Sequence, residues 1–217
     1  MKTDTQLQHD VLAELEWEPS IDASKIGVTA KDGVATLTGS VASYAGKMTA
    51  ERVTKRVYGV KAVANDIEVK IPGSSQRNDS DIAAAALSAL KWDTTVPEEH
   101  IKVTVRNGWI NLEGQVDWGY QKETAERVVR NLTGVIGLSS EVTVKSRAKP
   151  GDVKNKIEAA FKRSAEMDAR RVGVETRDGK VILRGNVHSC NEKEEAEQAA
   201  WAAPGVFEVE SHLTVVP

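Results

Sequence analysis

The chain has 217 residues, of which 40% are hydrophobic and 28% charged, and its formal net charge is −3. This composition is typical of a soluble globular protein, and the absence of a basic surplus argues against a dedicated nucleic-acid-binding protein. No apolar run approaches the roughly 20 residues of a membrane-spanning helix, and no signal-like apolar stretch follows Met1. As written, the sequence predicts a cytoplasmic protein with no transmembrane segment. The single Cys190 excludes an intramolecular disulfide and a Cys-rich metal site.

The first element expected along the chain is an amphipathic helix. Leu7, Val11, Leu12 and Leu15 form an apolar stripe at helical spacing, and Asp4 is the candidate N-cap. Similar stripes recur later in the chain, at Ile82, Ala86, Leu87 and Leu90, and at Val153, Ile157 and Phe161.

A β-hairpin is expected next, with its turn at Asp32-Gly33. This dipeptide favours a type I′ turn, because both central residues of that turn need a positive φ. The turn places Val28 opposite Leu37 and Ile26 opposite Gly39, so one face of the hairpin is apolar, as a correct register requires. The glycine either leaves room for a packed helix or marks a bulge. The corresponding opposed pairs later in the chain are Val103 with Leu112 and Val174 with Leu183.

A second helix, expected over about 43–57, and a last strand over 65–71 follow the hairpin. The helix carries Lys47 and Glu51, which are neighbours on its surface and favour a solvated ion pair over a contact with another unit or a lipid headgroup. The strand alternates Ile67, Val69 and Ile71. We expect it to pair beside the first strand of the hairpin, after a right-handed crossover from the second.

The same pattern occurs three times along the chain. A glycine ends each hairpin and a second glycine, followed by valine, lies 20 residues later; these structural glycines are Gly39 and Gly59, Gly114 and Gly134, and Gly185 and Gly205. Repeats of this kind indicate tandem copies of one folding unit. The predicted fold class is α+β, with α-β-β-α-β units at 1–71, 79–146 and 150–217, each a three-stranded mixed sheet with two helices on one face.

The repeated unit resembles the BON domain. The similarity lies in a V-x-L-x-G-x-V pattern, a helix bearing Lys and Ala-Glu, a Gly-Val corner and a final V-x-N-x-I-x-V. The first copy reads "ATLTGSVASYAGKMTAERVTKRVYGVKAVANDIEV" over 35–69, and the other copies span 110–144 and 181–215. The resemblance covers nearly the whole chain.

The resemblance implies a non-enzymatic binding module linked to osmotic or general stress. It implies association with phospholipid membranes or cell-envelope surfaces, and a periplasmic location if a native leader has been removed. One cytoplasmic relative joins a BON unit to a LysM unit and binds potassium. The alternative is a cytoplasmic protein–protein scaffold or a potassium-responsive scaffold, which the lack of a leader in the sequence as written and its near-neutral charge favour. Neither function needs a catalytic residue, a cofactor or a metal centre.

Candidate contacts with an anionic phospholipid or a protein partner are exposed aromatic and basic residues. Trp118 and Tyr120 lie in a loop beside a glycine, where they either insert at a bilayer interface or cover a neighbouring unit. Tyr44 precedes the basic cluster of the first unit. The basic candidates are Arg52, Lys55 and Arg56 in the first unit and Lys162 and Arg163 in the third.

Overall fold

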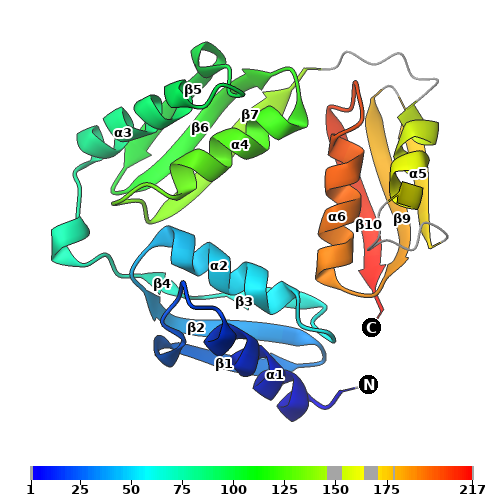
Figure 1. Ribbon diagram of the computed structural model, residues 1–217, viewed down its shortest axis with the longest axis horizontal. Helices are drawn as coiled ribbons and strands as arrows, with labels where there is room; N and C mark the ends of the chain where they lie inside the picture. The colour runs from blue at the N-terminus through cyan, green and yellow to red at the C-terminus, as the bar shows by residue number, and fades with distance from the viewer. Residues whose placement is uncertain (1, 146–152, 164–170, 178, 217) are drawn as a thin grey trace. The chain divides into compact units, whose positions relative to one another are not determined.

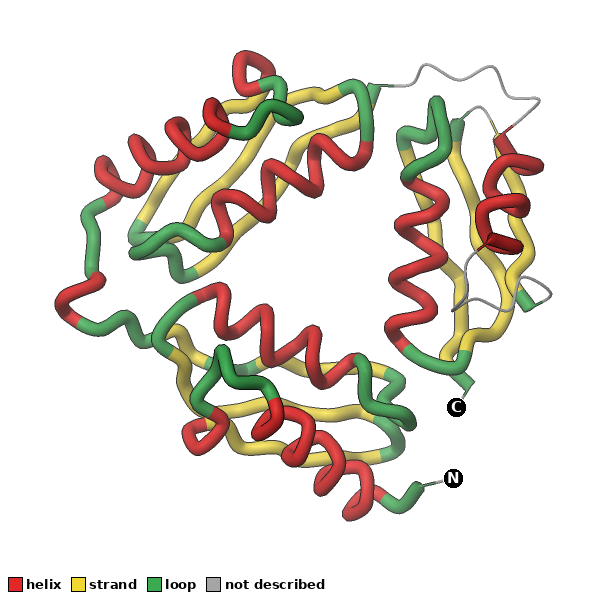
Figure 2. The backbone as a smooth tube through the Cα atoms, in the orientation of Figure 1, coloured by secondary structure: helices red, strands yellow, loops and turns green. Residues whose placement is uncertain are grey.

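The computed structural model describes residues 2–145, 153–163, 171–177 and 179–216. It contains three α/β units joined in tandem, each with its helices on one face of a mixed sheet (Figures 1 and 2). This confirms the predicted fold class. The predicted boundaries at 146 and 150 lie outside the described residues.

The three units have the same order of elements. The first contains α1 (Asp4–Trp17), β1 (Ile26–Lys31), β2 (Val34–Val41), α2 (Tyr44–Lys55), β3 (Ala62–Asn65) and β4 (Glu68–Val69). The second contains α3 (Asp79–Trp92), β5 (Ile101–Arg106), β6 (Trp109–Val116), α4 (Gly119–Arg130) and β7 (Gly137–Val144). The third contains α5 (Val153–Arg163), β8 (Val172–Arg177), β9 (Lys180–Val187), α6 (Cys190–Trp201) and β10 (Glu208–Val215).

The hairpin register is confirmed in all three units. Val28 lies opposite Leu37, and the equivalent pairs are Val103 with Leu112 and Val174 with Leu183. Each of these leucines is fully buried. Asp32 and Gly33 both have positive φ, at 53° and 86°, as a type I′ turn requires.

The predicted strand order is wrong. The last strand of each unit pairs with the second strand of the hairpin, so the sheet orders are β1-β2-β3, β5-β6-β7 and β8-β9-β10. In the first two units this pairing is parallel. The second hairpin strand has eight residues and the first has six. With the longer strand central, more backbone groups find partners on both sides, and the crossover returns the chain next to the strand it left.

The glycine that ends each hairpin permits a close backbone approach and does not make room for a helix. A Cβ on Gly39 would lie 2.0 Å from the carbonyl oxygen of Lys25, in the 3₁₀ turn before β1. Gly114 and Gly185 would meet the carbonyls of His100 and Arg171 at the same distance. The φ of Gly39 is +106°, a conformation that other residues rarely adopt. Gly39 stays in register with Ile26, so it does not interrupt the ladder.

The N-cap of helix α1 is Thr3, one residue before the predicted Asp4. Thr3 caps the helix through a capping box, in which its hydroxyl accepts from the Gln6 N–H at 3.2 Å and Gln6 Oε1 accepts from the Thr3 N–H at 3.0 Å. The Asp4 carboxylate instead accepts a hydrogen bond from the Asp32 N–H at 2.9 Å. An acid at the start of the helix thus holds the hairpin turn.

The helix stripes are narrower than predicted. Ile82, Ala86 and Leu90 of α3 are buried, but Leu87 is 54% exposed. A helix that packs on one sheet buries positions spaced by four residues, and Leu87 lies about 100° around the helix from Ala86. In the first unit the last strand begins at Ala62 and not at the predicted Asn65. The prediction missed the first residues of this strand because they do not show the alternation of apolar and polar residues that marks a strand in a sequence.

Candidate functional site

The eight predicted contact residues fall into three separate groups. Tyr44 opens α2, Arg52 and Lys55 lie in its last turn, and Arg56 follows it. Trp118 immediately precedes α4 and Tyr120 lies in its first turn, and Lys162 and Arg163 end α5. Each group belongs to a different unit, and the groups occupy non-equivalent positions in the repeat.

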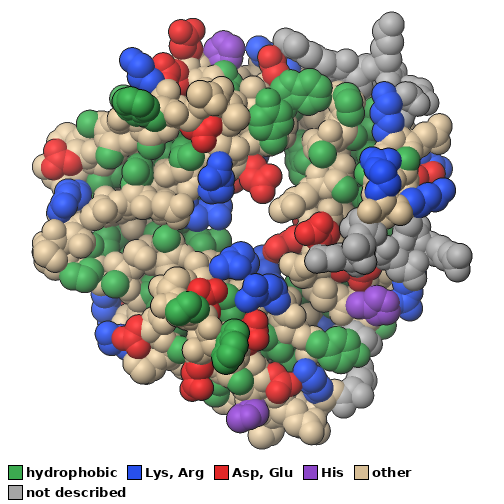
Figure 3. Space-filling model, in the orientation of Figure 1, with side chains coloured by type: hydrophobic (Ala, Val, Ile, Leu, Met, Phe, Trp, Pro, Cys, Tyr) green, Lys and Arg blue, Asp and Glu red, His purple; other side chains and the backbone are tan. Residues whose placement is uncertain are grey.

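The basic residues of the first group are paired with carboxylates. Arg56 lies 3.1 Å from Glu14, and Arg52 lies 3.7 Å from Glu18, both across the two helices of the unit. Lys55 lies 3.1 Å from Glu51. Figure 3 shows basic and acidic side chains interspersed on the face in view. The cluster is therefore less cationic than its sequence suggests, although surface pairs of this kind are weak and exchange readily.

The other two groups also lie at the surface. Lys162 and Arg163 are exposed, and within the described residues neither forms an ion pair. Trp118 and Tyr120 are also exposed. Gln121 Oε1 accepts from the backbone N–H groups of Asp117 and Trp118, both at 3.0 Å. These hydrogen bonds fix the start of α4, so the two aromatic rings project from an ordered turn.

The structure adds an aromatic surface that the sequence interpretation missed. Trp17, the last residue of α1, is 83% exposed and lines an open depression with Glu14, Arg56 and Tyr58. Tyr58 is also exposed. Trp92 ends α3 at the equivalent position of the second unit and is 85% exposed. The equivalence of the two tryptophans in the repeat was the signal available in the sequence.

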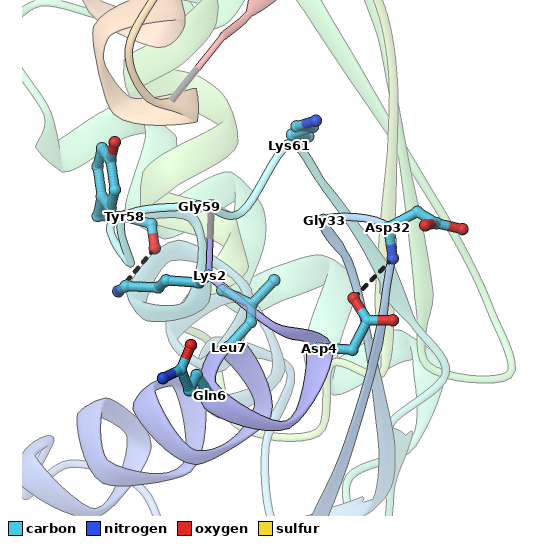
Figure 4. A pocket seen from close by; sticks show the side chains of 9 residues that line it. All are labelled: Lys2, Asp4, Gln6, Leu7, Asp32, Gly33, Tyr58, Gly59 and Lys61. Atoms are coloured by element: carbon cyan, nitrogen blue, oxygen red, sulfur yellow. Dashed lines mark hydrogen bonds between the residues drawn. The ribbon is translucent and has the colours of Figure 1, made fainter.

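A second hollow, of about 460 Å³, lies at the hairpin end of the first unit (Figure 4). Lys2 spans it, donating a hydrogen bond to the Tyr58 carbonyl at 3.0 Å and lying 2.7 Å from an Asp10 carboxylate oxygen. Its Nζ also lies 5.3 Å from the centre of the Tyr58 ring, within cation–π range. Asp4 holds the hairpin turn on the other side. These polar groups hold the N-terminal segment against the fold and supply no nucleophile with a base.

Metal ligands are not gathered anywhere in the described part of the chain: no group of three or more His, Cys, Asp and Glu side chains is placed to hold an ion. In the same residues, no helix combines the length and the apolar character needed to cross a bilayer.

Comparison with known proteins identifies the repeated unit. A model of the BON domain matches residues 3–71, 78–146 and 151–217. The chain belongs to the BON domain family. Osmotically-inducible protein Y of Escherichia coli K12 is 30% identical to it over 146 residues, which cover 65% of this chain and 73% of that protein.

Solved structures give a weaker likeness to the three BON units. CdsD, a structural protein of the type III secretion system of Chlamydia trachomatis, is 15% identical, and the alignment covers 96% of this chain and 91% of that one with a TM-score of 0.28. A structure of the CdsD C-terminal domain gives the same TM-score at 14% identity, with full coverage of both chains.

The first BON unit contains a polar cluster around Glu51. It is neither the solvated pair with Lys47 nor the contact with another unit or a lipid headgroup that the sequence suggested for this residue. Glu51 pairs with Lys55 and not with Lys47, because a glutamate followed by a lysine four residues later has the better orientation on a helix. Its carboxylate also accepts from Asn65 Nδ2 at 3.0 Å, and the same amide donates to the Lys47 carbonyl at 3.3 Å. Asn65 stands where the last strand breaks before resuming at Glu68. Partial burial alone raises the pKa of Glu51, but the hydrogen bonds from Asn65 and Lys55 and the nearby lysines lower it overall.

Asn65→Ser should raise the pKa of Glu51. The second and third units already have serine at this point of the repeat, as Ser140 and Ser211. In the native protein the lowered pKa stabilises the first unit above the ordinary glutamate pKa of 4.5, and this contribution is lost as the pH falls through the lower folded value. The variant should therefore lose stability at neutral pH and depend less on pH in the acid range. An NMR titration of the Glu51 carboxyl carbon measures the change. Asn131→Ser, at an exposed site of the second unit, is the control, and an unchanged Glu51 pKa in Asn65→Ser contradicts the assignment.

Proposed function

We propose that this chain is a non-enzymatic binding module that associates with phospholipid membrane or cell-envelope surfaces during osmotic or general stress. Its membership of the BON family supports this proposal, as does its similarity to a protein named for osmotic induction.

Trp17 and Trp92 are the observation that carries the proposal. A single exposed apolar residue is ordinary on a protein surface. Here the same side chain occupies the same position in two units and is more than four-fifths exposed in both. The indole ring is amphipathic and is enriched at membrane–water interfaces, where its apolar body and its N–H group are both satisfied.

The charge distribution favours weak contacts that act together. Arg56 lies beside Trp17 and Tyr58, close enough to exchange its Glu14 partner for an anionic headgroup. Lys162 and Arg163 add two exposed cations in the third unit. Since no single group is strongly cationic, affinity depends on several sites reaching one surface, which multiplies their individual binding constants. Trp118 and Tyr120 are a further candidate contact in the second unit.

Replacing both Trp17 and Trp92 with alanine should reduce binding to anionic vesicles by about tenfold or more, since each indole removed from an interface costs on the order of 1 kcal/mol. Co-sedimentation of the full chain with vesicles of mixed phosphatidylcholine and phosphatidylglycerol at low salt measures the effect. Leu87→Ala removes another exposed apolar side chain from α3 and serves as the matched control. Equal pelleting of the double variant and the wild type would contradict the assigned surface, and no pelleting of the wild type would contradict the proposed function.

A further inference from the structure

Strand β5 forms an edge of the sheet of the second unit, on the side where α3 packs (Figure 1). Within the described residues it pairs with β6 alone. The turn over 107–108 makes Arg106 and Trp109 a hydrogen-bonded pair. Hydrogen-bonded and non-hydrogen-bonded pairs alternate along an antiparallel ladder, so Val103 and Val105 direct their backbone N–H and C=O groups away from β6. Such a row of outward groups is a template for another strand.

The first unit closes the same edge with a side chain. Gln8 Nε2 of α1 donates to the Val28 carbonyl at 2.7 Å, and Val28 is the counterpart of Val103 in the repeat. The second unit has Ala83 at the position of Gln8, and its methyl group has no donor to offer. Val28 and the third unit's Val174 are 5% and 3% exposed, whereas Val103 is only half-buried. The centre of β5 is therefore the least covered of the three equivalent strands.

Two exposed cations stand along this edge. Lys102 and Arg106 lie four residues apart on the face of β5 that the helices do not cover. In the part of the chain that the structure describes, neither forms an ion pair. Arg106 has Trp109 opposite it in the ladder, and Glu113, opposite Lys102, accepts a hydrogen bond from Asn111 Nδ2 at 2.8 Å. The edge thus presents positive charge at two fixed positions, on either side of its outward backbone groups.

We propose that β5 binds an extended segment of a partner protein as an added antiparallel strand, and that this segment has the pattern acidic-apolar-x-apolar-acidic. Its two apolar residues exchange backbone hydrogen bonds with Val103 and Val105 and extend the apolar face of the sheet. Its two acidic residues meet Lys102 and Arg106 on the other face. In binding of this kind the main-chain hydrogen bonds supply affinity and the alternating side chains supply specificity.

The charges of β5 disfavour a second copy of the chain as the occupant. If two β5 strands paired antiparallel about Thr104, Lys102 of each would lie opposite Arg106 of the other. Like charges in directly opposed positions are destabilising, and basic residues on an edge strand commonly prevent self-pairing. The same two cations that oppose self-pairing therefore select an acidic segment. This proposal does not rest on membrane association, because β5 contains neither Trp17 nor Trp92.

Titration of the full chain with the peptide Gly-Glu-Val-Thr-Val-Glu-Gly, blocked at both ends, tests the proposal. We expect weak saturable binding by NMR and calorimetry, with the largest amide shifts in β5 and cross-strand nuclear Overhauser effects between the peptide and Val103. A peptide with lysine in place of both glutamates should bind about tenfold more weakly, because it places like charges against Lys102 and Arg106.

Methylation of the peptide backbone tests the added strand itself. In the proposed register both peptide valines direct their N–H groups toward β5, and the threonine directs its N–H group away from it. N-methylation of the two valines should weaken binding by about tenfold or more, since it removes two interstrand hydrogen bonds. N-methylation of the threonine is the matched control and should leave binding nearly unchanged. Equal losses from the two modifications would contradict the strand pairing.

Ala83→Gln tests the edge from the protein side, because it introduces the residue with which the first unit closes its own edge. Glutamine is a good helix former, so the variant should fold. By occupying the Val103 carbonyl it should weaken peptide binding by about tenfold. Replacing both Lys102 and Arg106 with glutamate should reverse the preference between the acidic and the basic peptide.

Three outcomes would overturn the proposal. These are no binding of the acidic peptide at millimolar concentration, equal binding by Ala83→Gln and the wild type, or concentration-dependent dimerisation through β5 in place of peptide binding. Vesicle co-sedimentation separates this site from the proposed function. The Trp17 and Trp92 double variant should lose vesicle binding and bind the acidic peptide as the wild type does.

Discussion

Gly39→Ala is expected to destabilise the first BON unit by about 3 kcal/mol or more. Effects of this size arise where a substitution strains the backbone or overpacks the core. The added methyl group would lie 2.0 Å from the Lys25 carbonyl oxygen, in backbone that cannot move without breaking the start of β1. The φ of +106° adds a conformational penalty for any residue with a Cβ. Hydrogen exchange of the full chain, resolved by peptide, should show early loss of protection over β1 and β2 while the other units stay protected.

Gly73→Ala is the matched control for this prediction. Gly73 lies between the first two units, and a Cβ there meets nothing within 4 Å. Its replacement should leave the exchange of all three units unchanged. Equal protection of β1 and β2 in Gly39→Ala and the wild type would show that the close approach in the 3₁₀ turn does not constrain the fold.

Leu112→Ala should destabilise the second unit by about 3–5 kcal/mol, the range for truncating a fully buried leucine. Leu112 has no exposed surface and lies on the central strand β6. Leu87→Ala, at a leucine of the same unit that is 54% exposed, should change stability by less than about 1 kcal/mol. Urea denaturation combined with exchange of β6 amides compares the two. Similar effects of both substitutions would mean that the register of β6 is not the one described.

The hairpins could be predicted from the sequence because their information is local. Asp32-Gly33 specifies the turn, the turn sets the register, and the register places Leu37 in the core. The strand order could not be derived in this way, because the pairing of the last strand depends on which strand becomes central. The exposure of Leu87 could not be predicted either, because it depends on how much of the surface of helix α3 the sheet covers.

The candidate site was less predictable than the fold. A sequence shows which residues are charged but not which of them form ion pairs. The ion pairs of Arg52 with Glu18 and of Arg56 with Glu14 could therefore be found only from the fold. Exposure of Trp17 follows from its place at the last turn of a helix, beyond the edge of the packed layer. The packing of the Trp109 ring against Gly137 could not be predicted, because the two residues are cross-strand neighbours that lie 28 positions apart in the sequence.

Quenching of tryptophan fluorescence by brominated phospholipids tests the central claim most directly, because it reports whether indole rings enter the acyl region of a bilayer. The account predicts that anionic vesicles containing brominated lipid quench the wild-type chain. It also predicts that replacing both Trp17 and Trp92 with phenylalanine removes most of this quenching while the vesicles still bind protein. Vesicle binding without quenching of the wild type, or undiminished quenching in the double variant, would contradict the assignment of these residues as the membrane contact.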